Sequence, residues 1–212
     1  MIKYILGNSC YICDNKINCN DLICDNCLND ITYIPYINFI NSNGNFYFNN
    51  VYTLLEYNDI LKKIIHLYKF ENIRSLSKLL SELILKRYSL EFFNQYDYIV
   101  PVPLHNKKFK KRGFNQTLKI LQEFIDEDKL FNAVFKIKNT KQQSLTKSKL
   151  ERKENLENIF DIEIKEIKHI KNKNILLFDD IFTTGATLNA IAKPFFYSMA
   201  NKIDILTIGV SL

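Results

Sequence analysis

Apolar residues recur along this chain with two different periods, and these periods predict where helices and strands form. Between Ile60 and Ile84 the apolar positions have helical spacing, which predicts two amphipathic helices separated near Glu71 to Arg74. The stretch from Asp97 to Pro103 predicts a strand that ends where Pro101 and Pro103 cannot donate backbone hydrogen bonds.

Shorter apolar runs predict further strands. Phe46 to Phe48 and Val51 to Tyr57 are interpreted as two strands joined by a hairpin turn at Asn49-Asn50, because Asn tolerates positive φ. Between the later strands, a polar stretch with little apolar periodicity is interpreted as a mobile loop from Lys138 to Phe160. The further strands are expected at Leu130 to Ile137, Ile159 to Ile164 (an edge strand) and Ile203 to Val210.

The stretch from Ile175 to Thr187, ILLFDDIFTTGAT, joins an apolar run to a polar turn. Its first four residues, Ile175 to Phe178, suit a strand buried on both faces of a parallel sheet. Residues that follow such a strand lie at the carboxyl edge of the sheet, where α/β folds bind ligands. Pro194, well inside the helix expected after the turn, should kink that helix or end it early.

The chemistry of this turn predicts a ligand with a phosphate at one end. A helix that begins at Gly185 and its threonines offers unpaired N–H groups and the positive end of a dipole. Asp179 and Asp180 cannot also bind phosphate, so hydroxyls or a hydrated Mg²⁺ are their expected partners. The ligand implied also carries a diol or a metal-bound pyrophosphate. A buried strand ending in a capped helix with two solvated aspartates is the alternative.

Length and composition set limits on this interpretation. With 212 residues the chain can bury one substantial core plus a small appendage. Its 47% hydrophobic and 25% charged residues are typical of a soluble globular protein. No run of about 18 apolar residues predicts a membrane span, and the cysteines at the start interrupt any signal peptide. We therefore expect a cytoplasmic location.

The net charge of +6 is concentrated in the middle of the chain. Between Pro103 and Lys153 there are fourteen Lys or Arg residues against five acidic ones, which suits phosphates or nucleic acid as well as a solvated lysine face. This region contains a basic run, interpreted as a loop that turns at Gly113 into the next helix. As a candidate pyrophosphate or polyanion clamp, the run presents Lys107, Lys108, Lys110, Lys111 and Arg112.

The cysteines predict a metal site near the N-terminus. Two CxxC pairs, separated by ten residues, have the spacing of a tetrahedral Zn²⁺ site formed by Cys10, Cys13, Cys24 and Cys27. Because this segment is small and polar, the metal would supply most of its folding energy. Disulfides or a redox CxxC are alternatives that a cytosolic location and the doubled motif disfavour. Cys19 is the spare cysteine, and the sequence assigns it no role.

The segment from Ile175 to Thr187 closely resembles the binding signature of the type I phosphoribosyltransferases. The resemblance implies that Asp179 and Asp180 hold the ribose hydroxyls of phosphoribosyl pyrophosphate (PRPP), which is bound with Mg²⁺. It implies that the 5-phosphate is wrapped by Thr183, Thr184, Gly185, Ala186 and Thr187. It also implies a parallel-rich sheet with flanking helices over residues 45–212. The cysteine pairs place a zinc ribbon before this domain, at residues 1–35. Pyrophosphate is the leaving group in phosphoribosyltransferase chemistry, so Arg112 joins Asp179 and Asp180 as a candidate catalytic residue.

Four features occur together in one order and resemble the ComF family, phosphoribosyltransferase-like competence proteins associated with DNA uptake and natural transformation. They are the cysteine ribbon, VPVPLH followed by RGFNQ, a spaced central pattern, and DDIFTTGAT. The central pattern consists of Thr140, Gln143, Leu145, Arg152, Asn155 and Phe160. The resemblance covers nearly the whole chain, although Lys138, Ser144 and Ala200-Asn201 depart from the family pattern.

The resemblance implies a protein of DNA uptake that binds PRPP, or a related phosphoribosyl ligand, with Mg²⁺. Its basic run would contact single-stranded DNA, with Phe109, Phe114 and Phe135 available for stacking. A DNA-translocation helicase is a candidate partner. An active phosphoribosyltransferase of nucleotide or base metabolism is the alternative, and a zinc-dependent interaction module with a vestigial pocket is a third interpretation. Because the sequence shows no acceptor pocket, it leaves catalysis and ligand sensing open.

Overall fold

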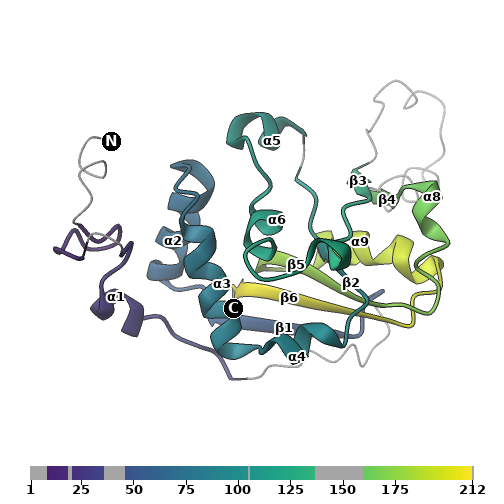
Figure 1. Ribbon diagram of the computed structural model, residues 1–212, viewed down its shortest axis with the longest axis horizontal. Helices are drawn as coiled ribbons and strands as arrows, with labels where there is room; N and C mark the ends of the chain where they lie inside the picture. The colour runs from purple at the N-terminus through teal and green to yellow at the C-terminus, as the bar shows by residue number, and fades with distance from the viewer. Residues whose placement is uncertain (1–8, 19–20, 36–45, 105, 137–159, 212) are drawn as a thin grey trace.

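The computed structural model describes residues 9–18, 21–35, 46–104, 106–136 and 160–211, without the side chains of residues 106 and 107. Its centre is a four-stranded sheet in the order β1-β6-β5-β2, in which every strand runs parallel to its neighbours. These strands are β1 (Asn50–Glu56), β2 (Tyr98–Pro101), β5 (Asn174–Phe182) and β6 (Lys202–Val210). A separate antiparallel pair consists of β3 (Val134–Lys136) and β4 (Phe160–Ile162) (Figure 1).

Helices cover both faces of the parallel sheet. One buried cluster packs against α2 (Asp59–Phe70), α3 (Leu76–Arg87), α4 (Leu90–Asn94) and α6 (Gln116–Leu121). On the opposite face, a second cluster joins the sheet to the β3–β4 pair and α9 (Ala186–Tyr197). The remaining described helices are α1 (Asp25–Asn29), α5 (Asn106–Arg112), α8 (Ile164–Ile167) and the short η2 (Glu127–Lys129). The expected mixed α/β class with a parallel-rich sheet is confirmed.

The two central strands carry the most apolar sequence, because helices cover them on both sides. In β6 every residue after Lys202 is buried, and in β5 the run from Ile175 to Phe178 is buried. The predicted helix pair is also confirmed, as α2 and α3 with a break between Phe70 and Leu76. Asn58 begins α2 by accepting a hydrogen bond from the N–H of Leu61 at 3.0 Å.

The predicted hairpin at Asn49-Asn50 is wrong. Asn50 is the first residue of β1, which runs parallel to β6, and Phe46 to Phe48 form no strand. The Asn49 side chain accepts a hydrogen bond from the N–H of Ile203 at 2.9 Å, and its N–H donates to the Ile203 carbonyl at 2.7 Å. The asparagines therefore attach β1 to a distant strand instead of turning the chain back on itself.

The interpretation of the basic run as a loop is also wrong, because residues 106–112 form helix α5. Lys and Arg are good helix formers. The helix ends at Gly113, whose φ of +77° is accessible to glycine at little cost and whose N–H donates to the Phe109 carbonyl at 2.7 Å.

The remaining expectations concern two short strands, the proline in α9 and the loop between the later strands. The strands expected at residues 130–137 and 159–164 are shorter, as β3 and β4, and Ile164 instead begins α8 with 89% of its surface exposed. Helix α9 continues past Pro194 to Tyr197. The expected mobile loop lies outside the described residues except for Phe160. Among the described helices, none has both the length and the apolar character needed to cross a membrane.

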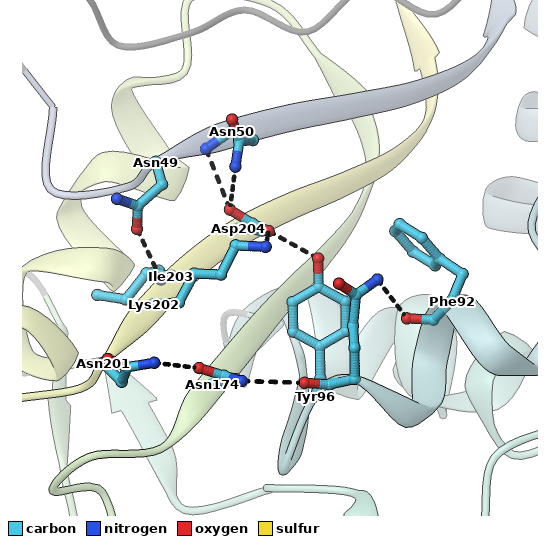
Figure 2. Close-up of polar contacts among 10 residues, drawn as sticks. Asn49, Asn50, Phe92, Tyr96, Asn174, Asn201, Lys202, Ile203 and Asp204 are labelled. Carbon is cyan, nitrogen blue, oxygen red and sulfur yellow. Dashed lines mark hydrogen bonds and ion pairs between the residues drawn. The ribbon is translucent and has the colours of Figure 1, made fainter.

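A buried polar network holds the sheet together at the amino ends of β1 and β6 (Figure 2). Its centre is Asp204, which has 0% exposed surface. One carboxylate oxygen accepts from the N–H of Asn50 at 3.2 Å and from its side-chain amide at 2.9 Å. The other accepts from the hydroxyl of Tyr96 and pairs with Lys202 Nζ, both at 2.7 Å. Because buried carboxylates need such partners, this network fixes the pairing of β1 with β6.

Candidate functional site

The four cysteines expected to bind zinc lie together. The Sγ atoms of Cys10, Cys13, Cys24 and Cys27 all lie within 4.8 Å of one another, so this cluster could hold a metal ion. Zinc with four thiolates at about 2.3 Å requires sulfur atoms roughly 3.8 Å apart. The donor set is therefore compatible with a structural zinc ion, whereas Cys19 lies outside the described residues.

Local backbone hydrogen bonds favour the thiolate of one member of this cluster, Cys10, whereas burial raises the pKa of Cys27. The Sγ atom of Cys10 accepts hydrogen bonds from the N–H groups of Ile12 and Cys24, both at 3.3 Å. Burial would raise the pKa of Cys10, but backbone donors, including those of Cys24 and Ile12, outweigh it and lower the pKa to about 7. A thiol that ionises near neutral pH is suited to metal binding, because the metal ligand is the thiolate.

The cysteine module packs on the rest of the same chain. Cys10 and Cys27 belong to the buried cluster that also contains residues of α2 and α3, and Lys63 Nζ of α2 donates a hydrogen bond to the Ile12 carbonyl. Figure 1 shows α1 beside α2, at the end of the molecule away from β3 and β4. The chain then runs along β1, where the N–H of Glu56 donates to the Thr32 carbonyl at 3.0 Å. The module is thus attached to the helix layer and to the open sheet edge.

Asp179 and Asp180 lie near the carboxyl end of β5, a strand flanked on both sides by parallel neighbours. Before the carboxylates, Leu177 belongs to the buried cluster under α9 and Phe178 to the cluster under α2. After them, Ile181 packs with the α2 cluster and Phe182 with the α9 cluster, so the strict alternation of faces does not continue through Asp179 and Asp180. Both carboxylates are influenced by Lys69 of α2.

The environment of Asp179 favours its neutral form. Burial and the adjacent charge of Asp180 raise the pKa of Asp179 to about 7, although Lys69, Lys108 and a hydrogen bond from the N–H of Asp180 at 2.8 Å oppose the shift. Two carboxylates in one small volume cannot both ionise freely without a cation. This pair is therefore electrostatically prepared for Mg²⁺, or for hydroxyl groups that can donate.

Lys69 is a site residue that the sequence did not identify. It lies in the last turn of α2 and forms an ion pair with Asp180, and both side chains are mostly buried. Sequence reasoning placed it only near the end of an amphipathic helix. In the sequence Lys69 is only a lysine between Tyr68 and Phe70. It can be identified as a site residue only once α2 is known to end beside β5.

The turn after β5 leaves backbone N–H groups without an acceptor among the described residues, although Gly185 itself is buried. Gly185 has φ of +72° and precedes α9, whose first hydrogen bond runs from the N–H of Asn189 to the Gly185 carbonyl at 2.8 Å. Within the described part of the chain, the N–H groups of Gly185 and Thr187 donate to no protein acceptor. The other residues of the turn are exposed, namely Thr183, Thr184, Ala186 and Thr187. The turn can therefore supply donors to an anion.

Arg112, at the end of α5, lies near the strand-end carboxylates. Burial lowers the pKa of Arg112, and the negative charge of Asp180 opposes that shift. Its guanidinium lies 4.9 Å from the centre of the Phe70 ring, and its Nη1 donates to Gln116 Oε1 at 3.0 Å. The structure thus brings Arg112 and Lys69 to the same carboxylate.

The remaining basic residues of the run differ in their surroundings. Lys108 is exposed and acts electrostatically on Asp179, whereas Lys110 and Lys111 are exposed to solvent. The side chain of Lys107 lies outside the described residues, as do His105 and the central pattern from Thr140 to Asn155. In the described part of α5, Lys108, Lys110 and Lys111 are all exposed, and the charges of Lys108 and Arg112 act on the carboxylates.

The aromatic residues expected to stack on DNA also differ. Phe109 and Phe135 are 48% and 46% exposed. Phe114 packs against Tyr68, with ring centres 5.5 Å apart, and the guanidinium of Arg74 lies 4.9 Å from its centre. Phe114 is therefore a packing residue, and only the other two remain available to a base.

Comparison with known proteins points to one group of relatives. The chain is 27% identical over 191 residues to "Competence protein F" of Haemophilus influenzae, covering 81% of this chain and 82% of the relative. It is 29% identical over 192 residues to "Competence protein ComFC" of Bacillus subtilis, covering 91% and 73%. It is 28% identical over 164 residues to "DNA utilization protein YhgH" of Escherichia coli, covering 72% and 68%. No protein-family model matches the chain.

Proposed function

We propose a role in DNA uptake for this chain, which belongs to the ComF family of competence proteins. The names of the relatives, competence and DNA utilization proteins, support this role. In this role the protein binds PRPP with Mg²⁺ on a phosphoribosyltransferase-like domain, and contacts single-stranded DNA. Its cysteine module binds zinc, and its place of action is the cytoplasm, where a DNA-translocation helicase is a candidate partner.

One observation carries the ligand proposal: adjacent carboxylates, a donor turn and two cations meet after β5. On this proposal the ribose diol contacts Asp179 and Asp180, and the 5-phosphate contacts the N–H groups of Gly185 and Thr187. These donors lie at the start of a 12-residue helix, whose dipole favours an anion. Lys69 and Arg112 then face the pyrophosphate.

The residues act mainly by positioning and by neutralising charge. Mg²⁺, when bound, neutralises the pyrophosphate and offsets the paired negative charge of the two aspartates. Lys69 already compensates Asp180, so a metal ion or a hydroxyl that reaches this carboxylate shares it with Lys69 or displaces it. Arg112 keeps guanidinium N–H groups for the oxygens of the leaving group.

The DNA-binding proposal assigns the strand to the exposed surface of α5. Lys110 and Lys111 supply phosphate contacts, and Phe109 offers a ring on which a base can stack. The surface is close to the ligand site through Lys108 and Arg112, whose charges interact with Asp179 and Asp180. The two ligands are therefore expected to influence each other's affinity.

Calorimetry with PRPP and Mg²⁺, with and without single-stranded DNA, tests the proposal. We expect saturable binding that is lost in the double variant Asp179→Ala and Asp180→Ala while folding is retained. Asp161→Ala removes an exposed aspartate of β4 and is the matched control, which should bind as wild type does. Wild-type protein that is folded and metal-loaded but does not bind PRPP would refute the ligand proposal.

A second measurement separates sensing from catalysis. Wild-type protein is incubated with PRPP, Mg²⁺ and a panel of nucleobases and amines, and pyrophosphate release is recorded. Release with one acceptor would identify a phosphoribosyltransferase, whereas binding without release supports a sensor in DNA uptake. If the aspartate double variant restored competence as fully as wild type, the pocket would be vestigial.

A further inference from the structure

Gln116 is a buried polar residue whose hydrogen bonding is incomplete. It is 2% exposed, and its amide nitrogen Nε2 has no partner among the described residues. A buried donor without an acceptor is destabilising, and an apolar side chain of similar shape would avoid that loss. The residue therefore needs a reason beyond packing.

The backbone around Gln116 is fixed from several directions. Its carbonyl accepts a hydrogen bond from the buried hydroxyl of Tyr68 at 3.0 Å. The preceding residue, Asn115, begins α6 by accepting from the N–H of Thr117 at 3.2 Å, and its amide donates to the Val102 carbonyl at 3.1 Å. Val102 follows β2 directly, so Gln116 is anchored to the sheet.

The side chain of Gln116 connects this fixed backbone to Arg112 through a hydrogen bond. Its Oε1 accepts from Arg112 Nη1 at 3.0 Å, while the Phe70 ring lies 4.9 Å from the guanidinium carbon. One contact fixes the direction of the guanidinium and the other supports its plane. Phe70 adjoins Lys69, which contacts Asp180. Both cations of the site therefore depend on the C-terminal end of α2, which contains Lys69 and whose Phe70 ring packs against Arg112.

We infer that Gln116 is a positioning residue that orients Arg112 toward the pyrophosphate group of the ligand. The inference rests on the proposed function and goes beyond it, because it separates affinity for the pyrophosphate from affinity for the sugar phosphate. Gln116 does not touch the ligand. The unpaired amide nitrogen of Gln116 lowers the stability of the protein. This loss accompanies keeping the Oε1 acceptor beside the guanidinium.

The test compares two ligands that differ in the pyrophosphate. Ribose 5-phosphate retains the phosphate and the diol, whereas PRPP adds the group that Arg112 contacts. In Gln116→Leu, affinity for PRPP should fall about tenfold, the usual scale for a lost charge-assisted hydrogen bond. Affinity for ribose 5-phosphate should stay within about twofold of wild type, since its contacts do not involve Arg112.

A stability measurement accompanies the binding data. Gln116→Leu removes the unpaired donor, so its urea midpoint should equal or exceed that of wild type. Gln116→Met, which keeps an unbranched side chain but no acceptor, is the second variant and should behave in the same way. Gln122→Leu makes the same change at an exposed position just after α6 and should alter neither affinity nor midpoint.

The outcomes distinguish this inference from the proposed function. If wild type does not bind PRPP, the proposed function fails. If wild type binds PRPP and both Gln116 variants bind it equally well, the positioning role is overturned while the function stands. If the variants are less stable and lose affinity for both ligands alike, Gln116 is a structural residue and the inference is again overturned.

Discussion

Asp179 and Asp180 are neighbours in sequence but have different environments. Asp180 is paired with Lys69, whereas the protein raises the pKa of Asp179 to about 7. The difference follows from their contacts, because Lys69 forms its ion pair with Asp180, whereas burial and the adjacent charge raise the pKa of Asp179. A bound cation would therefore be needed to keep Asp179 ionised near neutral pH.

This difference predicts an unusual pH dependence of stability. An aspartate in the unfolded chain has a pKa near 3.9, so between about pH 4 and 7 the folded protein retains a proton that the unfolded chain has released. The contribution of Asp179 to the free energy of unfolding should therefore fall as pH rises through this window. Urea unfolding at several pH values tests this. The free energy of unfolding of Asp179→Asn, compared with that of wild type, should rise with pH by about 1 kcal/mol or more by neutral pH and above. A constant difference from acid to alkaline pH would contradict the assignment.

The network around Asp204 gives a second prediction at the residue scale. Tyr96→Phe removes a buried donor at 2.7 Å from this carboxylate, so it should lower the free energy of unfolding by about 1.5 to 3 kcal/mol. Tyr98→Phe is the matched control, because Tyr98 is only half-buried at the start of β2, and it should change the stability by less than about 0.5 kcal/mol. Chemical denaturation measures both variants. Equal effects would show that the hydroxyl of Tyr96 contributes nothing specific.

At the scale of elements, α5 joins the two proposed ligands. One face of this seven-residue helix presents Lys110 and Lys111 to solvent, and its end places Arg112 beside Phe70. A flexible loop with the same charges would lose more backbone conformational entropy when it ordered on a ligand. The helix therefore supplies a fixed basic surface next to the carboxylates.

Charge reversal on α5 should weaken single-stranded DNA binding in a salt-dependent manner. For Lys110→Glu with Lys111→Glu, the slope of log K against log salt should become shallower by about 1.4, if each lysine contacts one phosphate. Fluorescence anisotropy with an oligothymidine between about 50 and 200 mM salt measures the slope. Lys168→Glu with Lys171→Glu makes the same charge change at exposed positions after α8 and should leave it nearly unchanged. Equal losses in both pairs would indicate only a general effect of net charge.

At the scale of the whole molecule, the cysteine module and the main domain share a buried core. Cys10 and Cys27 are buried together with residues of α2, the helix that ends at the candidate site. Lys63 of that helix also donates a hydrogen bond to the carbonyl of Ile12, which lies between Cys10 and Cys13. Changes in the module are therefore expected to reach α2.

Metal removal tests this connection. A strong chelator, or the variant Cys24→Ser, should unfold the module and lower the melting temperature of the whole protein, because the metal stabilises only the folded state. Hydrogen exchange should become faster in α2, while exchange in β5 and β6, which are buried between two helix layers, should change least. Unchanged exchange in α2 after complete loss of metal would show that the module is independent of the domain.

Local features of the sequence predicted much of this structure. The apolar run before Asp179 predicted the central strand β5, and the helical spacing between Ile60 and Ile84 predicted α2 and α3. The hairpin prediction failed because distant partners decide the pairing. Asn49 and Asn50 suit a turn, yet they pair with Ile203 and Asp204 far along the chain. The loop interpretation of the basic run failed for a local reason, because Lys and Arg are good helix formers, and between the Phe70 and Gln116 contacts of Arg112 only the first is distant in sequence.

The sequence by itself determined the elements and the chemical groups: a cysteine quartet with zinc spacing, a strand that ends in two carboxylates, and a turn that requires Gly185. These depend on residues close together in the chain, whose conformational and ligand preferences are local. Only the tertiary structure decided that Lys69 forms an ion pair with Asp180, that Gln116 accepts a hydrogen bond from Arg112, and that Phe114 is a packing residue. The first and third contacts join residues tens of positions apart, and they exist because helices must cover both faces of the parallel sheet. The second joins residues only four positions apart, but it crosses the turn between α5 and α6, and the sequence did not predict α5.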